Sequence, residues 1–250
     1  MQGMHEVARM RAVQAPIIPI LTDLVRRTPG TISLGQGVVS YGPPAEALAA
    51  LAAFPRGIED HVYGPVEGSA DLVDAVWRKL EVENGVRRDR RRRVVVTAGG
   101  NMAFVNAVLA TTDPGDEVVL QTPFYFNHDM AIGLVGARTV AVPTGASWQL
   151  QPDAIRAAIT PRTRAVVTIS PNNPTGAVYP EAALREVSAL CAEHGLYHIH
   201  DEAYEYFTYG AAHFSPGGID DAAAPTITLH SLSKSYGMAS WRVGYIVITE

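Results

Sequence analysis

The feature that most constrains this chain is an alternation of short apolar runs with helix-like stretches, which starts at Val94 and continues almost to the last residue. Several runs are continuous rather than alternating with polar residues, as in strands that are buried on both faces. The runs cover 94–97, 117–121, 139–142, 165–169, 196–200, 226–230 and 243–248. We therefore predict an α/β fold in three αβα layers, with a mostly parallel sheet and helices on both of its faces.

Helical periodicity is clearest in residues 71–80 and 181–194. In the second stretch the apolar residues fall on one side, and Gly195 follows as a C-terminal stop. We expect Cys191 to lie in the core, because a free cysteine packs as a small apolar group. The first stretch is predicted to be a surface helix, which would leave Lys79 at the surface.

Proline and glycine interrupt the first part of the chain, residues 1–45. This pattern predicts an extended N-terminal arm with one helix near 20–27. Residues 46–250 are then expected to form the large domain.

Charge and cysteine content exclude several classes of protein. The 20 basic and 25 acidic residues leave a net charge of −5, which disfavours nucleic acid and anionic membranes as partners. The basic run at 87–93 could contact nucleic acid, but it lacks interleaved aromatic residues, and a solvated loop is favoured. The single cysteine excludes an internal disulfide and suits a reducing compartment, so we expect a cytoplasmic protein. His198 and His200 share a strand face without further metal ligands, so no metal site is predicted.

One of only two lysines in the sequence, Lys234, follows the apolar run 226–230. A lysine at the carboxyl end of a buried strand can be desolvated and can then act as a nucleophile or base. The hydroxyls of Ser231 and Ser233, with the guanidinium of Arg242, suit a phosphate monoester. A solvated surface lysine is the simpler interpretation of Lys234 taken alone.

Three further polar segments follow apolar runs. Asp201 emerges from 196–200 and needs a cationic or hydrogen-bonding partner. The loop SPNNPTG at 170–176 offers the amide of Asn173, and TAGGNMAF at 97–104 places glycines before a helix, where backbone N–H groups can bind an anion. A helix cap or an ordinary loop would explain each segment alone. In parallel sheets, however, ligands bind beyond the carboxyl ends of the strands, where these segments should converge.

In this order and spacing, the motifs SPNNPTG, DEAYEYF and SLSKSYGMASWRVGY, supported by LGQG and TAGGNMAF, resemble those of the class I/II aminotransferase family. These are fold-type I enzymes that use pyridoxal 5′-phosphate (PLP). The resemblance runs from about Leu34 to the last residue. It implies that residues 46–250 are a PLP-binding large domain.

The resemblance implies roles for the matching residues. Lys234 would hold the cofactor as a Schiff base and, once substrate frees it, would move the proton. Asp201 would pair with the pyridine nitrogen and so keep the ring an electron sink. Asn173 and Tyr204 would hydrogen-bond the 3′ oxygen of the ring, and Asn173 would also face the substrate. The phosphate would be bound by Gly100, Asn101, Ser231, Ser233 and Arg242.

Other aromatic and arm residues also match the family. Tyr125 would stack on the cofactor ring, and His128 would lie behind Asp201, although a helix cap or surface histidine fits the sequence nearly as well. Tyr63 resembles the tyrosine that reaches the phosphate in the neighbouring subunit, which implies a homodimer with shared active sites. Gly37 matches the arm segment that closes over the substrate, and Tyr41 on the same arm favours a neutral or aromatic amino acid.

The resemblance breaks at the C-terminus. Family members usually continue well beyond the position of Arg242 into a small domain, whose arginine binds the substrate α-carboxylate. We expect that domain to be absent here, which makes the chain a portion of a longer enzyme or a truncated product. No arginine in this sequence can be assigned to the carboxylate.

The expected activity is transfer of an amino group from an amino acid to a 2-oxo acid. A PLP-dependent lyase, acting by β-elimination or like an aminocyclopropane-carboxylate synthase, is an alternative on the same scaffold. A more remote alternative is a ligand-sensing regulator in which an aminotransferase-like domain is joined to a DNA-binding module.

Overall fold

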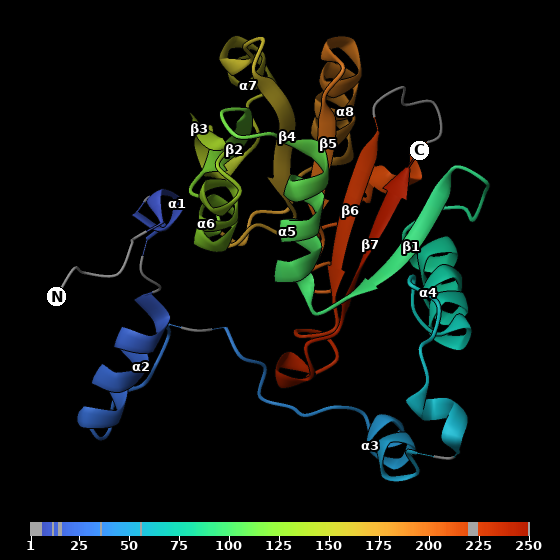
Figure 1. Cartoon of the computed structure of the whole chain (residues 1–250). Coiled ribbons are helices and arrows are strands. Elements are labelled where there is room, and N and C mark those ends of the chain that lie inside the picture. Colours follow the sequence, from blue (N-terminus) through green and yellow to red (C-terminus); the bar gives the residue numbers. More distant parts are fainter. Residues whose placement is uncertain are drawn as a thin grey trace, which may run out of the picture.

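The structure is a computed structural model that describes residues 7–11, 13–14, 17–35, 37–55, 57–219 and 225–249. At its centre is a seven-stranded sheet in the order β1-β7-β6-β5-β4-β2-β3 (Figure 1). The strands are β1 (Arg92–Thr97), β2 (Glu117–Thr122), β3 (Arg138–Pro143), β4 (Thr163–Ile169), β5 (Tyr197–Asp201), β6 (Thr226–Ser231) and β7 (Gly244–Thr249). Neighbouring strands from β6 to β3 are parallel, whereas β7 is antiparallel to both β1 and β6. Each predicted apolar run overlaps one strand, and the mostly parallel sheet is confirmed.

Helices lie on both faces of this sheet. The α-helices are α1 (Ala8–Arg11), α2 (Ile17–Arg27), α3 (Ala45–Ala52), α4 (Ala70–Glu83), α5 (Gly100–Thr111), α6 (Phe126–Leu134), α7 (Pro152–Ala158) and α8 (Glu181–His194). Short 3-10 helices cover Ile58–His61, Ala146–Trp148, Pro216–Gly218 and Ala239–Trp241.

Side chains alternate across the strands and so build two separate cores. On one face, Val167 of β4 packs in a cluster with Phe104 of α5. On the other face, its neighbour Val166 packs with Leu184 of α8. Cys191 is fully buried in this second cluster, as predicted. Burying one such aliphatic side chain contributes about 1.5–3 kcal/mol to the free energy of folding. The helices on both faces therefore stabilise the sheet.

Helix α4 covers the β1–β7 end of the sheet. Its Trp77 and Leu80 pack against Val94, Tyr245 and Val247. This contact places the C-terminal end of α4 close to the turn that follows β5, where Asn84 hydrogen-bonds Glu205.

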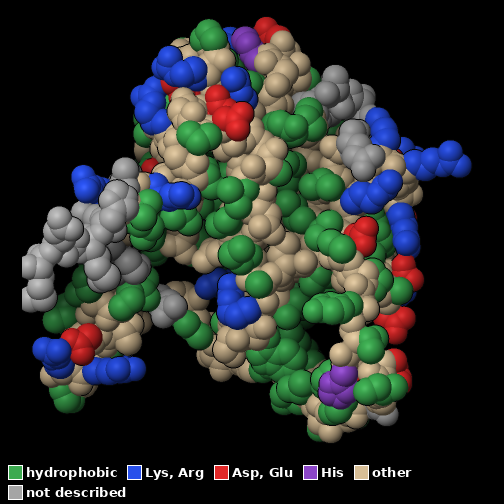
Figure 2. Space-filling model, viewed as in Figure 1, with side chains coloured by type: hydrophobic (Ala, Val, Ile, Leu, Met, Phe, Trp, Pro, Cys, Tyr) green, Lys and Arg blue, Asp and Glu red, His purple; other side chains and the backbone are tan. Residues whose placement is uncertain are grey.

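The N-terminal segment extends away from the sheet (Figure 1). The helix expected near 20–27 is α2, which begins earlier, at Ile17. Large apolar side chains in this part of the chain face solvent, with Leu34 94%, Val66 90% and Tyr63 106% exposed. Figure 2, viewed from the same side as Figure 1, shows hydrophobic side chains gathered along the lower part of the molecule. The boundary between arm and large domain at residue 45 stays a prediction.

Within the described residues, no helix combines the length and the apolar character that crossing a bilayer requires.

Candidate active site

The polar residues singled out in the sequence lie at one edge of the sheet, where the parallel strands end. Asp201 is the last residue of β5 and Ser231 the last of β6. Ser170 follows β4 directly, and its backbone N–H donates to the carbonyl of Asp201 at 3.1 Å. The loop between β1 and α5 reaches the same edge, since Gly100 lies beside Ser231. This is the edge at which open α/β sheets bind ligands.

A cradle for an anion forms where α5 begins. The Arg242 Nη1 atom donates to Ser233 Oγ at 3.2 Å and to the carbonyl of Ala239 at 2.9 Å. Arg242 has a φ of 56°, a left-handed value that is uncommon for a residue with a side chain. The helix N-terminus, the serine hydroxyls and the guanidinium together offer the donors that a phosphate monoester requires.

Two glycines that the sequence prediction had not assigned shape this cradle. Gly99 has a φ of 80°, and a Cβ atom there would lie 2.3 Å from Arg242 Nη2. A Cβ atom on Gly244 would lie 2.9 Å from the backbone nitrogen of Gly100 and 2.7 Å from the carbonyl oxygen of His230. Both glycines lie inside the motifs quoted above, TAGGNMAF and SLSKSYGMASWRVGY, and this was the only sequence feature that could have pointed to them.

Lys234 lies beside two other predicted site residues. Its Nζ atom donates to the carbonyl oxygen of Gly37 at 2.7 Å and lies 5.5 Å from the centre of the Tyr204 ring. Burial, followed by the positive charge of Arg242, lowers the pKa of Lys234. More of the amine is therefore neutral at a given pH than for a free lysine, which favours nucleophilic and base chemistry.

Asp201 is held by a buried histidine. The His128 Nε2 atom lies 3.2 Å from Asp201 Oδ2, and the backbone N–H of Ala203 donates to Oδ1 at 2.9 Å. His128 is 2% exposed, and its ring stacks on Phe104 with centroids 3.9 Å apart. The structure thus places His128 behind Asp201, and the cap and surface alternatives are wrong.

Two tyrosines border this carboxylate. Burial, then the negative charge of Asp201, raises the pKa of Tyr204 to about 12, so its hydroxyl keeps its proton and can donate a hydrogen bond. The Tyr125 hydroxyl accepts a hydrogen bond from Asn127 Nδ2 at 2.6 Å. Burial raises the pKa of Tyr125 too, and the side chain of Asn101 hydrogen-bonds its hydroxyl. Asn101, Tyr125 and Asp201 therefore lie close together.

Two predicted site residues are not drawn into this group. Tyr63 is fully exposed, and Asn173 is half-buried in its loop. The neighbouring Asn172 instead holds that loop, because its Oδ1 atom accepts from the Thr175 N–H at 3.2 Å and hydroxyl at 2.9 Å. The roles of Tyr63 and Asn173 stay predictions.

The exposure predicted for Lys79 is wrong. Its side chain is 13% exposed, forms an ion pair with Glu205 and donates to Asn84 Oδ1 at 2.7 Å. The 71–80 periodicity correctly predicted a helix, but the turn after β5 lies against its C-terminal end and covers this lysine.

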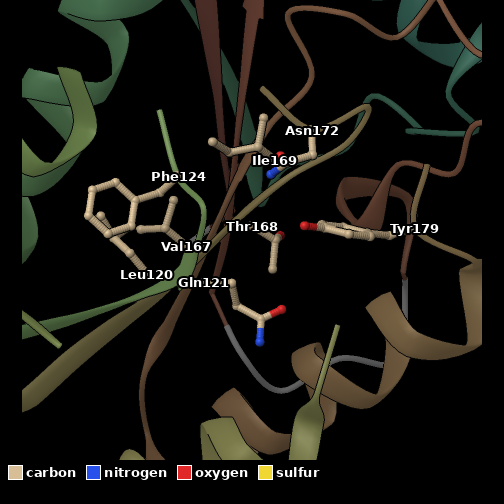
Figure 3. A pocket seen from close by; sticks show the side chains of 8 residues that line it. All are labelled: Leu120, Gln121, Phe124, Val167, Thr168, Ile169, Asn172 and Tyr179. Atoms are coloured by element: carbon tan, nitrogen blue, oxygen red, sulfur yellow. The ribbon is translucent and has the colours of Figure 1, made fainter. Parts of the chain in front are cut away.

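Behind the site lies a cavity of about 10 Å³, the room that a single water molecule needs. Figure 3 shows the Tyr179 hydroxyl pointing towards Thr168, with Gln121 nearby. Thr168 Oγ1 forms hydrogen bonds with both buried histidines of β5, at 2.8 Å from His198 Nε2 and 2.6 Å from His200 Nδ1. These contacts confirm that the two histidines share a face, and burial lowers the pKa of His198 to about 3.

The fold and this edge define an α/β domain in which a lysine of lowered pKa lies beside a group of potential anion donors. A family model described as aminotransferase class I and II matches residues 29–250. The chain therefore belongs to the class I and II aminotransferase family, whose members generally depend on PLP.

Individual relatives agree with this assignment. The chain is 36% identical over 248 residues to an aromatic aminotransferase of Arabidopsis thaliana, covering 97% of this chain and 61% of that protein. It is 39% identical over 226 residues to an aspartate/prephenate aminotransferase of Thermus thermophilus, covering 89% of this chain and 57% of that one. The solved N-succinyldiaminopimelate aminotransferase of Mycobacterium tuberculosis superposes with a TM-score of 0.87 at 34% identity, covering 98% of this chain and 64% of that chain. The chain thus spans about three fifths of the length of the relatives it matches.

Proposed function

We propose that this chain is the cofactor-binding part of a PLP-dependent aminotransferase that moves an amino group from an amino acid to a 2-oxo acid. The observation that carries the proposal is the position of the Lys234 amine, next to the Tyr204 ring and close enough to Arg242 for their charges to interact, at the sheet edge that also carries the Asp201–His128 pair. Family membership supports the same reaction class.

The residues present fit the cofactor. Gly99 leaves the space that the guanidinium of Arg242 occupies, and Ser231, Ser233 and the start of α5 add donors around the phosphate position. Near the expected position of the pyridine nitrogen, Asp201 is held by His128 and can keep a proton on that nitrogen. When bound, PLP supplies an electron sink for the charge that develops at the substrate α-carbon.

The side chains around that sink have separate tasks. Lys234 would bind the cofactor and move a proton at the α-carbon, which its lowered pKa favours. The Tyr204 hydroxyl would donate a hydrogen bond to the 3′ oxygen of the ring, and the side-chain amide of Asn173 would donate a second one. Tyr125 would cover the ring face, and Gly37 would close the arm over the substrate.

A homodimer with shared sites belongs to the same proposal. Its support is the exposed apolar surface of the N-terminal part of the chain and the full exposure of Tyr63. This sequence has one cysteine, Cys191, and so holds no internal disulfide, which suits a reducing compartment such as the cytoplasm.

The test is to supply the purified protein with PLP, a panel of amino donors and a 2-oxo acid acceptor. We expect a visible absorbance band of bound cofactor and a new 2-oxo acid formed in equal amount to the new amino acid. Lys234→Ala should abolish the band. Release of ammonia and a 2-oxo acid without an acceptor would instead identify a lyase.

A further inference from the structure

Three side chains at the C-terminal end of α4, Lys79, Glu83 and Asn84, contact the turn that carries Tyr204. We call them the α4 clamp. Lys79 forms an ion pair with Glu205, the residue after Tyr204. Asn84 Nδ2 donates to Glu202 Oε2 at 3.1 Å and to Glu205 Oε2 at 2.8 Å. The clamp therefore holds the turn on both sides of Tyr204.

The turn itself leaves little freedom between these anchors. The Glu202 N–H donates to the carbonyl of Leu229 in β6 at 2.8 Å, and the Glu205 N–H donates to the carbonyl of Glu202 at 3.0 Å. The Phe207 N–H donates to the carbonyl of Tyr204 at 2.8 Å and so forms the next turn of the backbone. A displacement of Glu205 would therefore move Tyr204 with it.

Glu202 is buried and the Glu205 side chain is only 11% exposed, so the partners of these two carboxylates affect stability. Glu202 is 0% exposed and accepts from His213 Nε2 at 2.7 Å and from Ser215 Oγ at 2.6 Å. The two ring nitrogens of His230 each lie 3.7 Å from a carboxylate oxygen, one of Glu202 and one of Glu205. Removing a cationic partner from such a group is costly, because a buried charge then lacks compensation. The Lys79 ammonium fills that role on the α4 side.

The clamp also reaches the lysine loop. The Tyr206 hydroxyl donates to Glu83, and its oxygen lies 3.4 Å from the hydroxyl of Tyr236. Tyr236 stands inside the turn that the Gly237 N–H closes onto the carbonyl of Lys234 at 3.1 Å. The end of α4 thus contacts the turn that carries Tyr204 directly, and it reaches the loop that carries Lys234 through Tyr206.

We propose that Lys79 and Asn84 are positioning residues, which act through Glu202 and Glu205 to fix Tyr204 and Asp201 against the bound cofactor. This inference rests on the proposed function. It predicts that a substitution in the clamp changes the proton affinity of the bound cofactor even when the variant still folds.

The test compares Lys79→Met with wild type and with Arg78→Met, which removes an exposed charge from the same helix. The readout is the pH midpoint at which the visible absorbance of bound PLP changes. We expect Lys79→Met to raise the midpoint by about 0.5–1 unit, because a displaced Tyr204 stabilises the 3′ oxyanion less well. Arg78→Met should keep the wild-type midpoint, and Lys79→Arg should restore most of it.

A second variant covers the case in which Lys79→Met does not fold. Lys79→Met combined with Glu205→Gln removes both charges and leaves no buried carboxylate unpaired at that position. We expect this double variant to fold and still to show the raised midpoint. A wild-type midpoint in either folded variant would overturn the positioning role. If wild type and Arg78→Met also form no visible complex with PLP, the proposed function fails instead.

Discussion

The two lysines of this chain occupy different electrostatic environments. Lys79 is paired with a carboxylate, whereas the pKa of Lys234 is lowered by burial and by Arg242. Since only a neutral amine attacks an electrophile, an amine-specific reagent at limiting amount should modify Lys234 before Lys79. Peptide mass spectrometry after brief labelling measures both rates in one sample. Equal rates at the two lysines would contradict the environments described here.

Gly99 offers a second test of a single position. Its φ of 80° and the 2.3 Å approach to Arg242 mean that Gly99→Ala must displace the guanidinium. We expect PLP affinity to fall about tenfold or more, which corresponds to about 1.4 kcal/mol. Fluorescence titration with PLP would measure this loss.

The matched control for that substitution is Gly115→Ala. Gly115 has a similar φ of 93°, but a Cβ atom there would meet nothing within 4 Å. It carries the same kind of backbone strain without touching the cradle. Affinity lost equally in both variants would show that strain, and not the displaced guanidinium, is responsible.

The pair between α4 and the turn after β5 predicts a pH dependence of stability. Burial opposes ionisation of Glu205, but His230 and Lys79 hold its pKa to about 2, below the ordinary 4.5. A lowered folded-state pKa gives stability that is present above about pH 4.5 and is lost as the pH falls towards 2. Glu205→Gln should therefore lower the free energy of unfolding by about 3 kcal/mol near neutral pH, as measured by urea denaturation.

The difference between Glu205→Gln and wild type should shrink as the pH is lowered through this window. Glu193→Gln is the control, because Glu193 is paired with Arg156 on an exposed face of α8 and its loss should matter much less. A difference that stays constant from neutral to acid pH would exclude ionised Glu205 as the cause.

Sequence patterns predicted the elements better than their contacts. Continuous apolar runs revealed each strand, because a strand buried on both faces has no polar alternation to confuse it with a surface segment. The environment of Lys79 could not be found in this way, since its partner Glu205 lies 126 residues further along the chain. Gly99 and Gly244 were quoted in motifs but not assigned, because close approach between backbones depends on how separate loops meet.

The whole molecule presents an apolar surface that the described chain does not cover. Leu34 is 94% and Val66 90% exposed, and they belong to a large set of exposed apolar side chains between residues 7 and 66, more than the scattered single positions usual on a monomer. We expect a dimer in analytical ultracentrifugation. Replacing Leu34 and Val66 with glutamate should shift the mass towards that of a monomer while circular dichroism stays unchanged, and a dimer that persists would place the interface elsewhere.

Shared sites make a sharper prediction than dimerisation alone. If Tyr63 of one subunit completes the site of its partner, Lys234→Ala and Tyr63→Ala damage the same site from different chains. A mixed dimer then holds one site with both defects and one with neither. Because half of the dimers in an equal, randomly exchanged mixture are mixed, about one quarter of wild-type sites should return. Each variant is measured alone, mixed after brief unfolding and refolding, and assayed for the visible complex and for amino transfer. A mixture with no more signal than the average of its parents would show that each site is built from one chain.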